Sequence, residues 1–103
     1  MIKLIRSFIV TGDWEPVAAS FRKQKALYEE KYPQVKSFSV WSGVTGRVDR
    51  MSIEMTFESL AEEESWATAV MQDPAYMEAG MPMWENTKEF TDKLYRMMED
   101  PES

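Results

Sequence analysis

Three features of the sequence predict an α+β domain in which one antiparallel sheet carries its helices on a single face. Short segments with alternating apolar residues are separated by longer segments with helical spacing. These segments follow one another in the order strand, helix, strand, strand, helix, strand. Residues 51–78 are the most informative, because a strand there leads directly into a capped helix that stops at an Asp-Pro pair.

The first half of the chain begins with a predicted strand over residues 2–10, where apolar side chains lie on both faces. Such a strand is typical of the centre of a sheet, so we expect a central position for it. A helix follows, with Asp13 as its cap and Pro16 in its first turn. Its apolar stripe ends at Tyr32, because the next residue is a proline.

Two further strands follow this helix and are joined by a hairpin. The second strand is predicted over residues 36–42, and the loop over residues 43–47 contains two glycines. The third strand covers residues 48–57, and polar and apolar side chains alternate from Arg50 to its end. Its apolar face consists of Met51, Ile53, Met55 and Phe57.

A second amphipathic helix begins at a capping box formed by Ser59 and Glu62. We interpret the acidic run at residues 62–64 as a solvated helix start. The side chains expected to face inward are Leu60, Ala67, Val70 and Met71.

The end of the chain contains a further short helix and the last strand. Asp73 caps the short helix, Pro74 is its first residue, and it is expected to end near Gly80, before Pro82. The last strand is predicted over residues 90–98, and its mixture of polar and apolar side chains leaves its orientation open.

The order of these elements is the split βαβ, or ferredoxin-like, topology (βαββαβ). We expect residues 1–99 to form one such domain and residues 100–103 to be a frayed tail. The sheet face away from the helices would expose apolar side chains of the first strand or Trp41 beside a polar row of the third strand. Pairing two such faces would cover them, so we expect a symmetric homodimer.

The composition excludes several kinds of site and partner. The 103 residues include no cysteine and no histidine, which excludes zinc sites built on these ligands, haem held by them, and a cysteine nucleophile or histidine base. We therefore predict no metal and no cofactor. The 18 acidic and 12 basic residues disfavour nucleic acid and anionic membrane surfaces as partners, and no apolar run is long enough to span a membrane. The lack of cysteine agrees with a reducing compartment, so we expect a cytoplasmic protein.

Residues 57–79, FESLAEEESWATAVMQDPAYMEA, combine a strand that ends in an aromatic residue, an acidic-Ser helix start, and a helix break at Asp73-Pro74 before Tyr76. This combination resembles the dimeric α/β-barrel superfamily, in particular its antibiotic-biosynthesis-monooxygenase-like and NIPSNAP-like members. The Asp-Pro pair followed by a tyrosine is more similar to the NIPSNAP-like variant. In topology the resemblance covers essentially the whole chain.

The resemblance implies a ligand cleft between the sheet and the helices of each subunit. The residues that it would place near a ligand are Met51, Met55, Phe57, Met71 and Tyr76. Haem-degrading members carry a tryptophan where this chain has Phe57 and a haem-ligating histidine where it has Gly80. These departures argue against haem chemistry.

Four polar residues of the strands are candidates for chemistry in such a cleft. Arg6 and Glu54 lie in the middle of strands that are expected to be neighbours, so Arg6 could hold an anion and Glu54 could act as a base. Asp92 could supply a further carboxylate, and Tyr95 a hydroxyl for acid–base work. The alternative is structural: Arg6 and Glu54 pair across a dimer interface or reach solvent, and Tyr95 only packs.

The 9 methionines suit an adaptable apolar pocket for a hydrophobic or aromatic small molecule better than a Cu(I) site, because no histidine or cysteine supports copper.

Two functions remain open. The first is a cofactor-independent monooxygenase, isomerase or cyclase that acts on an aromatic or polyketide-like compound. The second is a non-catalytic dimeric binding or interaction protein.

Overall fold

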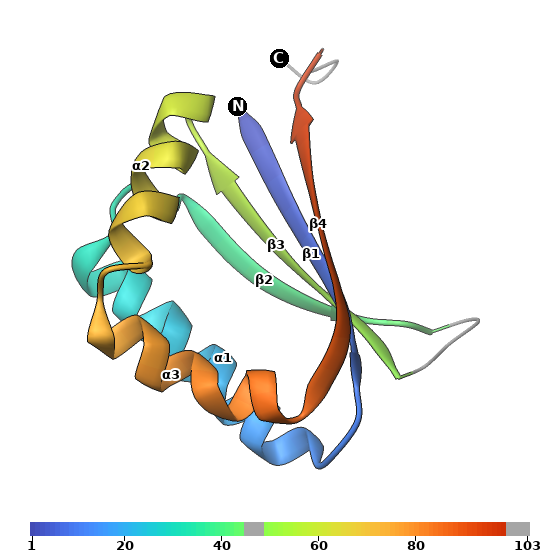
Figure 1. Ribbon diagram of the computed structural model, residues 1–103. Coiled ribbons are helices and arrows are strands. Elements are labelled where there is room, and N and C mark those ends of the chain that lie inside the picture. Colours follow the sequence, from blue (N-terminus) through green and yellow to red (C-terminus); the bar gives the residue numbers. More distant parts are fainter. Residues whose placement is uncertain (45–48, 99–103) are drawn as a thin grey trace.

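The computed structural model, which describes residues 1–44 and 49–98, contains a four-stranded antiparallel sheet with three helices on one of its faces (Figure 1). The elements are β1 (Ile2–Val10), α1 (Trp14–Lys31), β2 (Ser37–Ser42), β3 (Arg50–Phe57), α2 (Leu60–Val70), α3 (Pro74–Glu85) and β4 (Thr87–Arg96). The strand order is β2-β3-β1-β4, so β1 is central as predicted. The predicted α+β, ferredoxin-like topology is confirmed.

The main core lies between the sheet and the helices. On β3 the predicted alternation holds, and all four apolar side chains of its helix-facing side are buried. They pack with Ile2, Leu4 and Phe8 of β1, whose register pairs Leu4 with Met55. Aromatic rings fill the space above them: Phe57 packs on Trp66 at 5.4 Å between ring centroids, and Trp66 meets Tyr28 edge to face at 5.8 Å.

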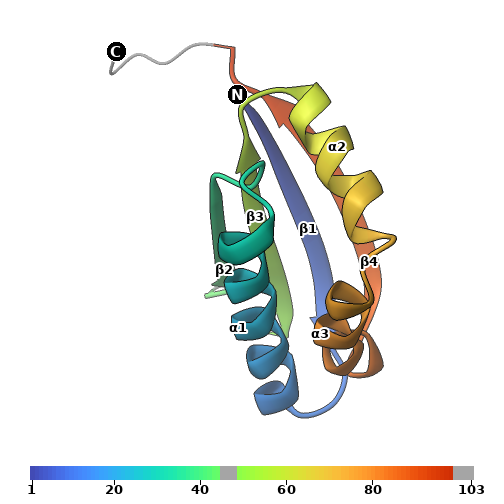
Figure 2. The same cartoon turned by 90° about the vertical axis from the view of Figure 1, so that its left-hand side faces the viewer.

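Helix α1 lies on the same face of the sheet as α3 (Figure 2). The two helices are held together by buried polar contacts. The Ser20 hydroxyl donates to the carbonyl oxygen of Ala79 at 2.5 Å. The Gln24 amide donates to Ser20 Oγ at 3.0 Å and lies 3.7 Å from the Met83 sulfur. At the start of α1 the predicted cap is only partly right, because Asp13 occupies the cap position without a side-chain hydrogen bond to the backbone.

Helix α2 starts at the predicted cap, where Ser59 Oγ accepts from the Glu62 backbone N–H at 3.2 Å. Its inward face was predicted incorrectly in part. Trp66 and Val70 are buried, whereas the Met71 side chain is 69% exposed. Trp66 and Val70 are four residues apart and therefore share one face, and Met71, one residue further, is turned by about 100° away from it.

Helix α3 is longer than predicted, because it continues through Pro82 to Glu85. A proline inside a helix removes one hydrogen bond and is usually costly. Here only one turn follows it, and side chains stabilise that turn: Asn86 Nδ2 donates to the Pro82 carbonyl at 2.8 Å, and Thr87 Oγ1 donates to the Met83 carbonyl at 2.7 Å. Burial of Met83 against α1 also stabilises this turn.

Strand β4 begins at Thr87, earlier than predicted, and contains an irregularity. Its pairing with β1 shifts between Ser7 and Ile9, and Glu89 adopts a left-handed backbone conformation with φ of 57°. An extra residue in one strand is a β-bulge, which bends the strand locally. Parts of the predicted hairpin loop and third strand (residues 45–48) and the predicted tail lie outside the described residues.

A polar link joins the end of α1 to the start of α3. Tyr32 donates to Asp73 Oδ2 at 2.5 Å, Asp73 Oδ1 caps α3 by accepting from the Ala75 N–H at 2.9 Å, and Lys31 lies 3.8 Å away. The Tyr32 hydrogen bond, with the Ala75 N–H and Lys31, lowers the pKa of Asp73. Burial and then Asp73 raise the pKa of Tyr32 to about 12. The predicted cap at Asp73 and Pro74 is confirmed.

This link predicts a pH-dependent contribution to stability. A carboxyl group with a lowered folded-state pKa stabilises the fold above its ordinary pKa of about 4 and loses that contribution as the pH falls through the folded value. Tyr32→Phe therefore lowers the urea midpoint at pH near 7, and the difference from wild type shrinks in acid below about pH 4. Thr68→Val, which also removes a hydroxyl but at an exposed position of α2, is the control. A Tyr32→Phe defect that is equal at all pH values would contradict the assignment.

Candidate functional site

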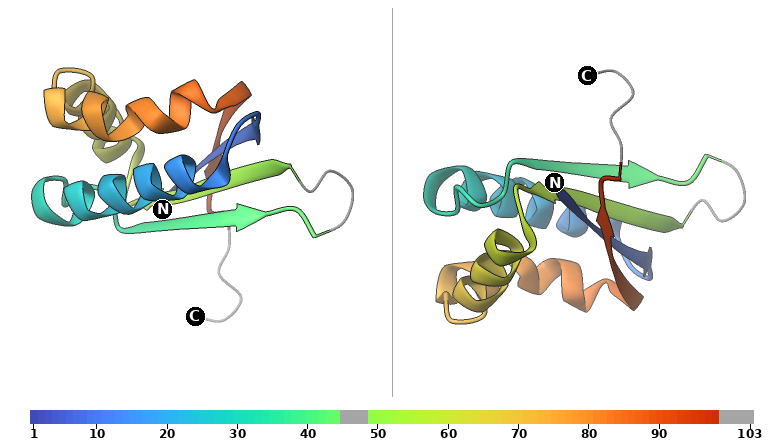
Figure 3. Two further views of the ribbon diagram at one scale, coloured as in Figure 1. Left: turned by 90° about the horizontal axis from the view of Figure 1, so that it is seen from below. Right: turned by 90° about the horizontal axis from the view of Figure 1, so that it is seen from above.

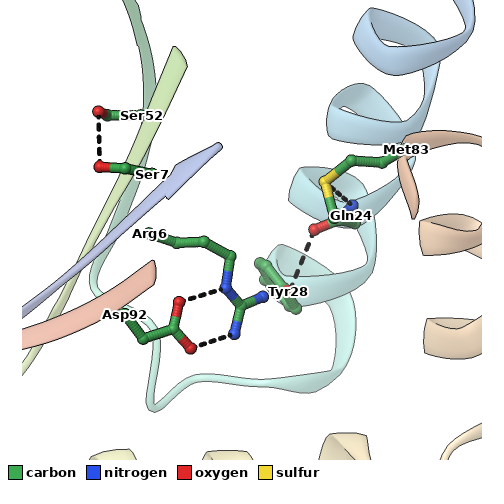
Figure 4. Close-up of polar contacts among 7 residues, drawn as sticks. All are labelled: Arg6, Ser7, Gln24, Tyr28, Ser52, Met83 and Asp92. Atoms are coloured by element: carbon green, nitrogen blue, oxygen red, sulfur yellow. Dashed lines mark hydrogen bonds and ion pairs between the residues drawn. The ribbon is translucent and has the colours of Figure 1, made fainter. Parts of the chain in front are cut away.

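Arg6 is a positive charge among the apolar residues that β1 turns toward the helices. Its side chain is 18% exposed, and a guanidinium cannot lose its charge to escape burial. The sheet register places Asp92 of β4 directly opposite it. Arg6 Nε donates to Asp92 Oδ1 at 2.8 Å and Nη2 donates to Oδ2 at 3.1 Å, which is a bidentate pair (Figure 4).

The electrostatics of Arg6 reflect both its burial and its partners. Burial alone lowers the pKa of Arg6, but the Asp92 carboxylate and the neighbouring Tyr76 hydroxyl outweigh burial and raise it overall. The guanidinium is therefore a fixed positive charge in the interior. A charge of this kind can stabilise an anion that binds beside it.

Two tyrosines lie on the inner side of Arg6. The guanidinium points toward Tyr28 of α1 (Figure 4), whose ring stacks on that of Tyr76 of α3 with a centroid distance of 6.3 Å. Burial, and then the Tyr76 beside it, raise the pKa of Tyr28. The Tyr28 hydroxyl thus stays protonated, and it donates to Gln24 Oε1 at 3.5 Å. Both rings are almost fully buried, so they form the closed inner wall of the site.

A cavity of about 330 Å³ opens on the outer side of Arg6 and is lined by Arg6, Trp84, Phe90 and Asp92. Trp84 contacts Tyr76 edge to face at 6.0 Å, and Phe90 stacks on Phe8 at 5.5 Å. The helices leave β4 largely uncovered, and its residues are exposed along almost the whole strand. The cavity is therefore a cleft that is open to solvent along β4. We call these four residues the Arg6 cleft.

Local backbone features position the two aromatic side chains of the Arg6 cleft. Gly80 of α3 lies one turn before Trp84, and a Cβ atom there would stand 3.0 Å from Cη2 and Cζ2 of the Trp84 ring. The bulge at Glu89 immediately precedes Phe90. Bulges and residues with unusual φ angles are frequent beside functional sites, where they reorient side chains.

Glu63 adds a second carboxyl group on the α2 side of Asp92. Burial, followed by Glu64 and Asp92, raises the pKa of Glu63. A carboxyl group with a raised pKa is a better proton acceptor when ionised than an ordinary one. No local pattern indicates the raised pKa of Glu63, because a glutamate in an acidic helix start is normally solvated.

The structure separates the predicted catalytic residues. Asp92 lies in the Arg6 cleft, whereas Glu54 and Tyr95 lie on the opposite face of the sheet. Glu54 is paired across the strands with Ile5 and lies 3.9 Å from Lys3, and Tyr95 is paired with Lys3. Arg6 and Glu54 lie on neighbouring strands, as expected, but on opposite faces of the sheet, because the register puts Ile53 opposite Arg6 and Ile5 opposite Glu54.

The predicted ligand-binding residues divide in a similar way. Arg6 and Tyr76 are at the cleft. Met55 and Phe57 are buried in the core, and Met51 lines a different cavity of about 590 Å³ near Trp14. Met71 lies on the surface, so its predicted inward position is wrong. Sequence reasoning missed Trp84, Phe90 and Tyr28 as residues of the site.

Another cavity, of about 370 Å³, lies on the opposite face between Lys3, Ile5, Thr56 and Tyr95. Its charged side chains are exposed, whereas the Arg6 cleft holds a partly buried, paired charge. In residues 1–44 and 49–98, acidic side chains form no group of three or more that is arranged to hold a metal ion. No helix of this part has the length and hydropathy of a membrane span.

The contact between Gly80 and Trp84 yields a test of how the cleft is shaped. Gly80→Ala improves helix propensity by about 1 kcal/mol, but its Cβ must displace the Trp84 ring. We expect a stability gain well below that value together with a changed tryptophan emission spectrum. The emission change should vanish in a Trp84→Phe background, and Glu78→Ala on the exposed side of α3 is the control. A stability gain of about 1 kcal/mol with an unchanged emission spectrum would show that Gly80 does not constrain the Trp84 ring.

No protein-family model matches the chain, and no curated protein matches it in sequence. Several solved structures share its fold at low identity. SnoaB, a cofactor-independent oxygenase from Streptomyces nogalater, has a TM-score of 0.79 and 8% identity, with 99% of this chain and 97% of SnoaB covered. A NIPSNAP-family protein of unknown function from Agrobacterium tumefaciens has a TM-score of 0.68 and 14% identity, covering 92% and 86%.

A third solved structure is a dimeric protein of unknown function and ferredoxin-like fold from Bacteroides fragilis. It has a TM-score of 0.67 and 16% identity, with 93% of this chain and 95% of that protein covered. The predicted resemblance to oxygenase-like and NIPSNAP-like structures is thus confirmed in fold. At these identities the comparison establishes architecture alone, and the chain has the ferredoxin-like fold of these proteins.

Proposed function

We propose that this chain is a small-molecule-binding protein that holds an aromatic or polyketide-like compound in the Arg6 cleft. One observation carries the proposal: a partly buried guanidinium, paired with Asp92, stands in the wall of an open cavity that is also lined by the rings of Trp84 and Phe90. Binding sites for small molecules typically combine apolar walls with a few polar groups that fix orientation. A planar compound between the two rings would meet Arg6 at its edge.

The activity that this cleft supports best is cofactor-independent oxygenation. Such a reaction begins when a base removes a proton from the substrate, which leaves an electron-rich anion that reacts with O₂. Arg6 would stabilise the negative charge of that anion. Glu63, whose pKa is raised by burial and by its acidic neighbours, is the proposed proton acceptor. An isomerase or a cyclase would use the same first step, and SnoaB, which shares the fold, is described as a cofactor-independent oxygenase.

The alternative is a binding protein without catalysis, and one observation favours it. Both oxygens of Asp92 accept hydrogen bonds from Arg6, so the carboxylate nearest to the guanidinium is a poor base in this state. Under this alternative the cleft binds the same class of compound and releases it unchanged.

We further propose that the protein is a homodimer formed through the open face of the sheet. The described part of the chain places nothing over this face (Figure 3). It carries Trp41, which is 56% exposed, and Tyr95, which is 49% exposed, beside the polar pairs Ser7–Ser52 and Ser37–Thr56. Aromatic side chains among polar groups are characteristic of interfaces between subunits. The Bacteroides fragilis protein of the same fold is described as dimeric, which supports the proposal.

The binding proposal is tested by calorimetric titration with neutral aromatic probes such as naphthol. Trp84→Ala and Phe90→Ala should each weaken binding about tenfold, because each removes a ring that contacts the probe. Trp41→Ala, on the opposite face, should leave the affinity unchanged.

Two further variants, Arg6→Gln and Glu63→Gln, separate the catalytic from the non-catalytic function. We expect consumption of O₂ with hydroxylated polycyclic compounds that is lost in Arg6→Gln and reduced in Glu63→Gln. Binding without any turnover would support the alternative. Equal binding by wild type and both ring variants would exclude the Arg6 cleft as the site.

The dimer proposal is tested by sedimentation at micromolar concentration. The wild type should sediment with twice the 12.0 kDa mass of the chain. Trp41→Asp should shift the protein toward the monomer, because a carboxylate at the interface is costly to bury. Lys23→Asp, on the exposed side of α1, makes a larger charge change and should leave the dimer intact. A monomeric wild type would contradict the proposal.

A further inference from the structure

Asp92 occupies the side of Arg6 from which a ligand in the cleft must approach. Tyr28 and Tyr76 close the inner side of the guanidinium, and both are almost fully buried. On the outer side, Asp92 takes the Nε and Nη2 donors, and its side chain is 49% exposed. A molecule in the cavity therefore meets Arg6 at the edge that Asp92 already covers.

The position of Asp92 allows it to leave this edge. It lies on β4, the edge strand, which the helices leave uncovered. Rotation of its side chain would return the carboxylate to water, where it is well solvated. The guanidinium cannot leave in the same way, because its side chain is only 18% exposed and it points inward, toward Tyr28 (Figure 4). Arg6 is thus the fixed half of the pair, and Asp92 is the half that can be exchanged.

We infer that Asp92 is an internal substitute for an anionic group of the ligand, an inference that rests on the proposed function and names its ligand class. The cleft takes an aromatic compound that bears a carboxylate or a similar planar oxyanion. That group replaces Asp92 on Arg6, while Trp84 and Phe90 contact the ring system. The exchange keeps the buried guanidinium paired throughout, because one bidentate partner replaces another of the same charge and geometry.

This exchange makes a prediction that a merely structural role for Asp92 does not make. If Asp92 only held Arg6 in place, its removal would loosen the guanidinium and weaken ligand binding. If Asp92 competes with the ligand, its removal strengthens the binding of anions and leaves neutral analogues unaffected.

The experiment compares the full chain with Asp92→Asn by calorimetric titration with two probes of equal ring size, naphthoate and naphthylmethanol. We expect Asp92→Asn to bind naphthoate about tenfold more tightly than wild type, with naphthylmethanol unchanged. Arg6→Gln should abolish the preference for the carboxylate. Glu54→Gln makes the same change of charge on the opposite face and should alter neither affinity. Asp92→Ser, which also lacks the carboxylate, is the second variant and should reproduce the gain.

The outcomes separate this inference from the function on which it rests. Naphthoate binding that is weaker or unchanged in both Asp92 variants overturns the exchange. If naphthylmethanol binds through Trp84 and Phe90 but naphthoate binds no better in any variant, the aromatic cleft stands and the anionic ligand class is wrong. If neither probe binds to wild type or to the variants, both the proposed function and the inference fail.

Discussion

The structure depends on a permanent charge that is held, largely out of solvent, between the sheet and the helices. Arg6 interrupts the apolar row that the central strand presents to the helices, and no change of protonation can neutralise it. Its partner Asp92 is on the edge strand beside it, at bidentate distance. A pair of this kind contributes little net stability, because desolvation offsets the attraction, yet removing one partner is costly. A charge that is expensive to maintain and open to solvent on one side is characteristic of a binding site.

The aromatic core connects this charge to the rest of the fold. Tyr28 contacts Trp66, Tyr32, Phe38 and Tyr76, so α1 is packed at once against β2, α2 and α3. Helices α1 and α3 approach closely at the small residues Ser20 and Ala79, where the Ser20 hydroxyl donates to the Ala79 carbonyl. Because α3 is fixed in this way, Trp84 at its end stands over the sheet beside Arg6. The packing of α1 against α3 thus determines both the rigid inner wall and the open outer edge of the cleft.

The fold itself does not choose a reaction. Proteins of this architecture include an oxygenase and proteins of unknown function, at identities too low to transfer residue roles. The amino-acid composition of the chain limits the chemistry that it can perform. Without histidine or cysteine, proton transfer falls to carboxyl groups and tyrosines, and the cleft offers both. Glu63 has a raised pKa, whereas the Asp92 carboxylate is hydrogen-bonded to the Arg6 guanidinium. The two carboxyl groups therefore differ in their ability to accept a proton.

The sequence by itself determined the elements whose signals are local. The alternation of β3, the central place of β1, and the cap at Asp73 and Pro74 all follow from neighbouring residues, and so does the absence of histidine chemistry. Only the tertiary structure decided the site. The pairing of Arg6 with Asp92 rather than Glu54 depends on register across strands 86 residues apart in sequence. The orientation of β4, the continuation of α3 through Pro82 and the environment of Glu63 likewise depend on packing, which no local pattern encodes.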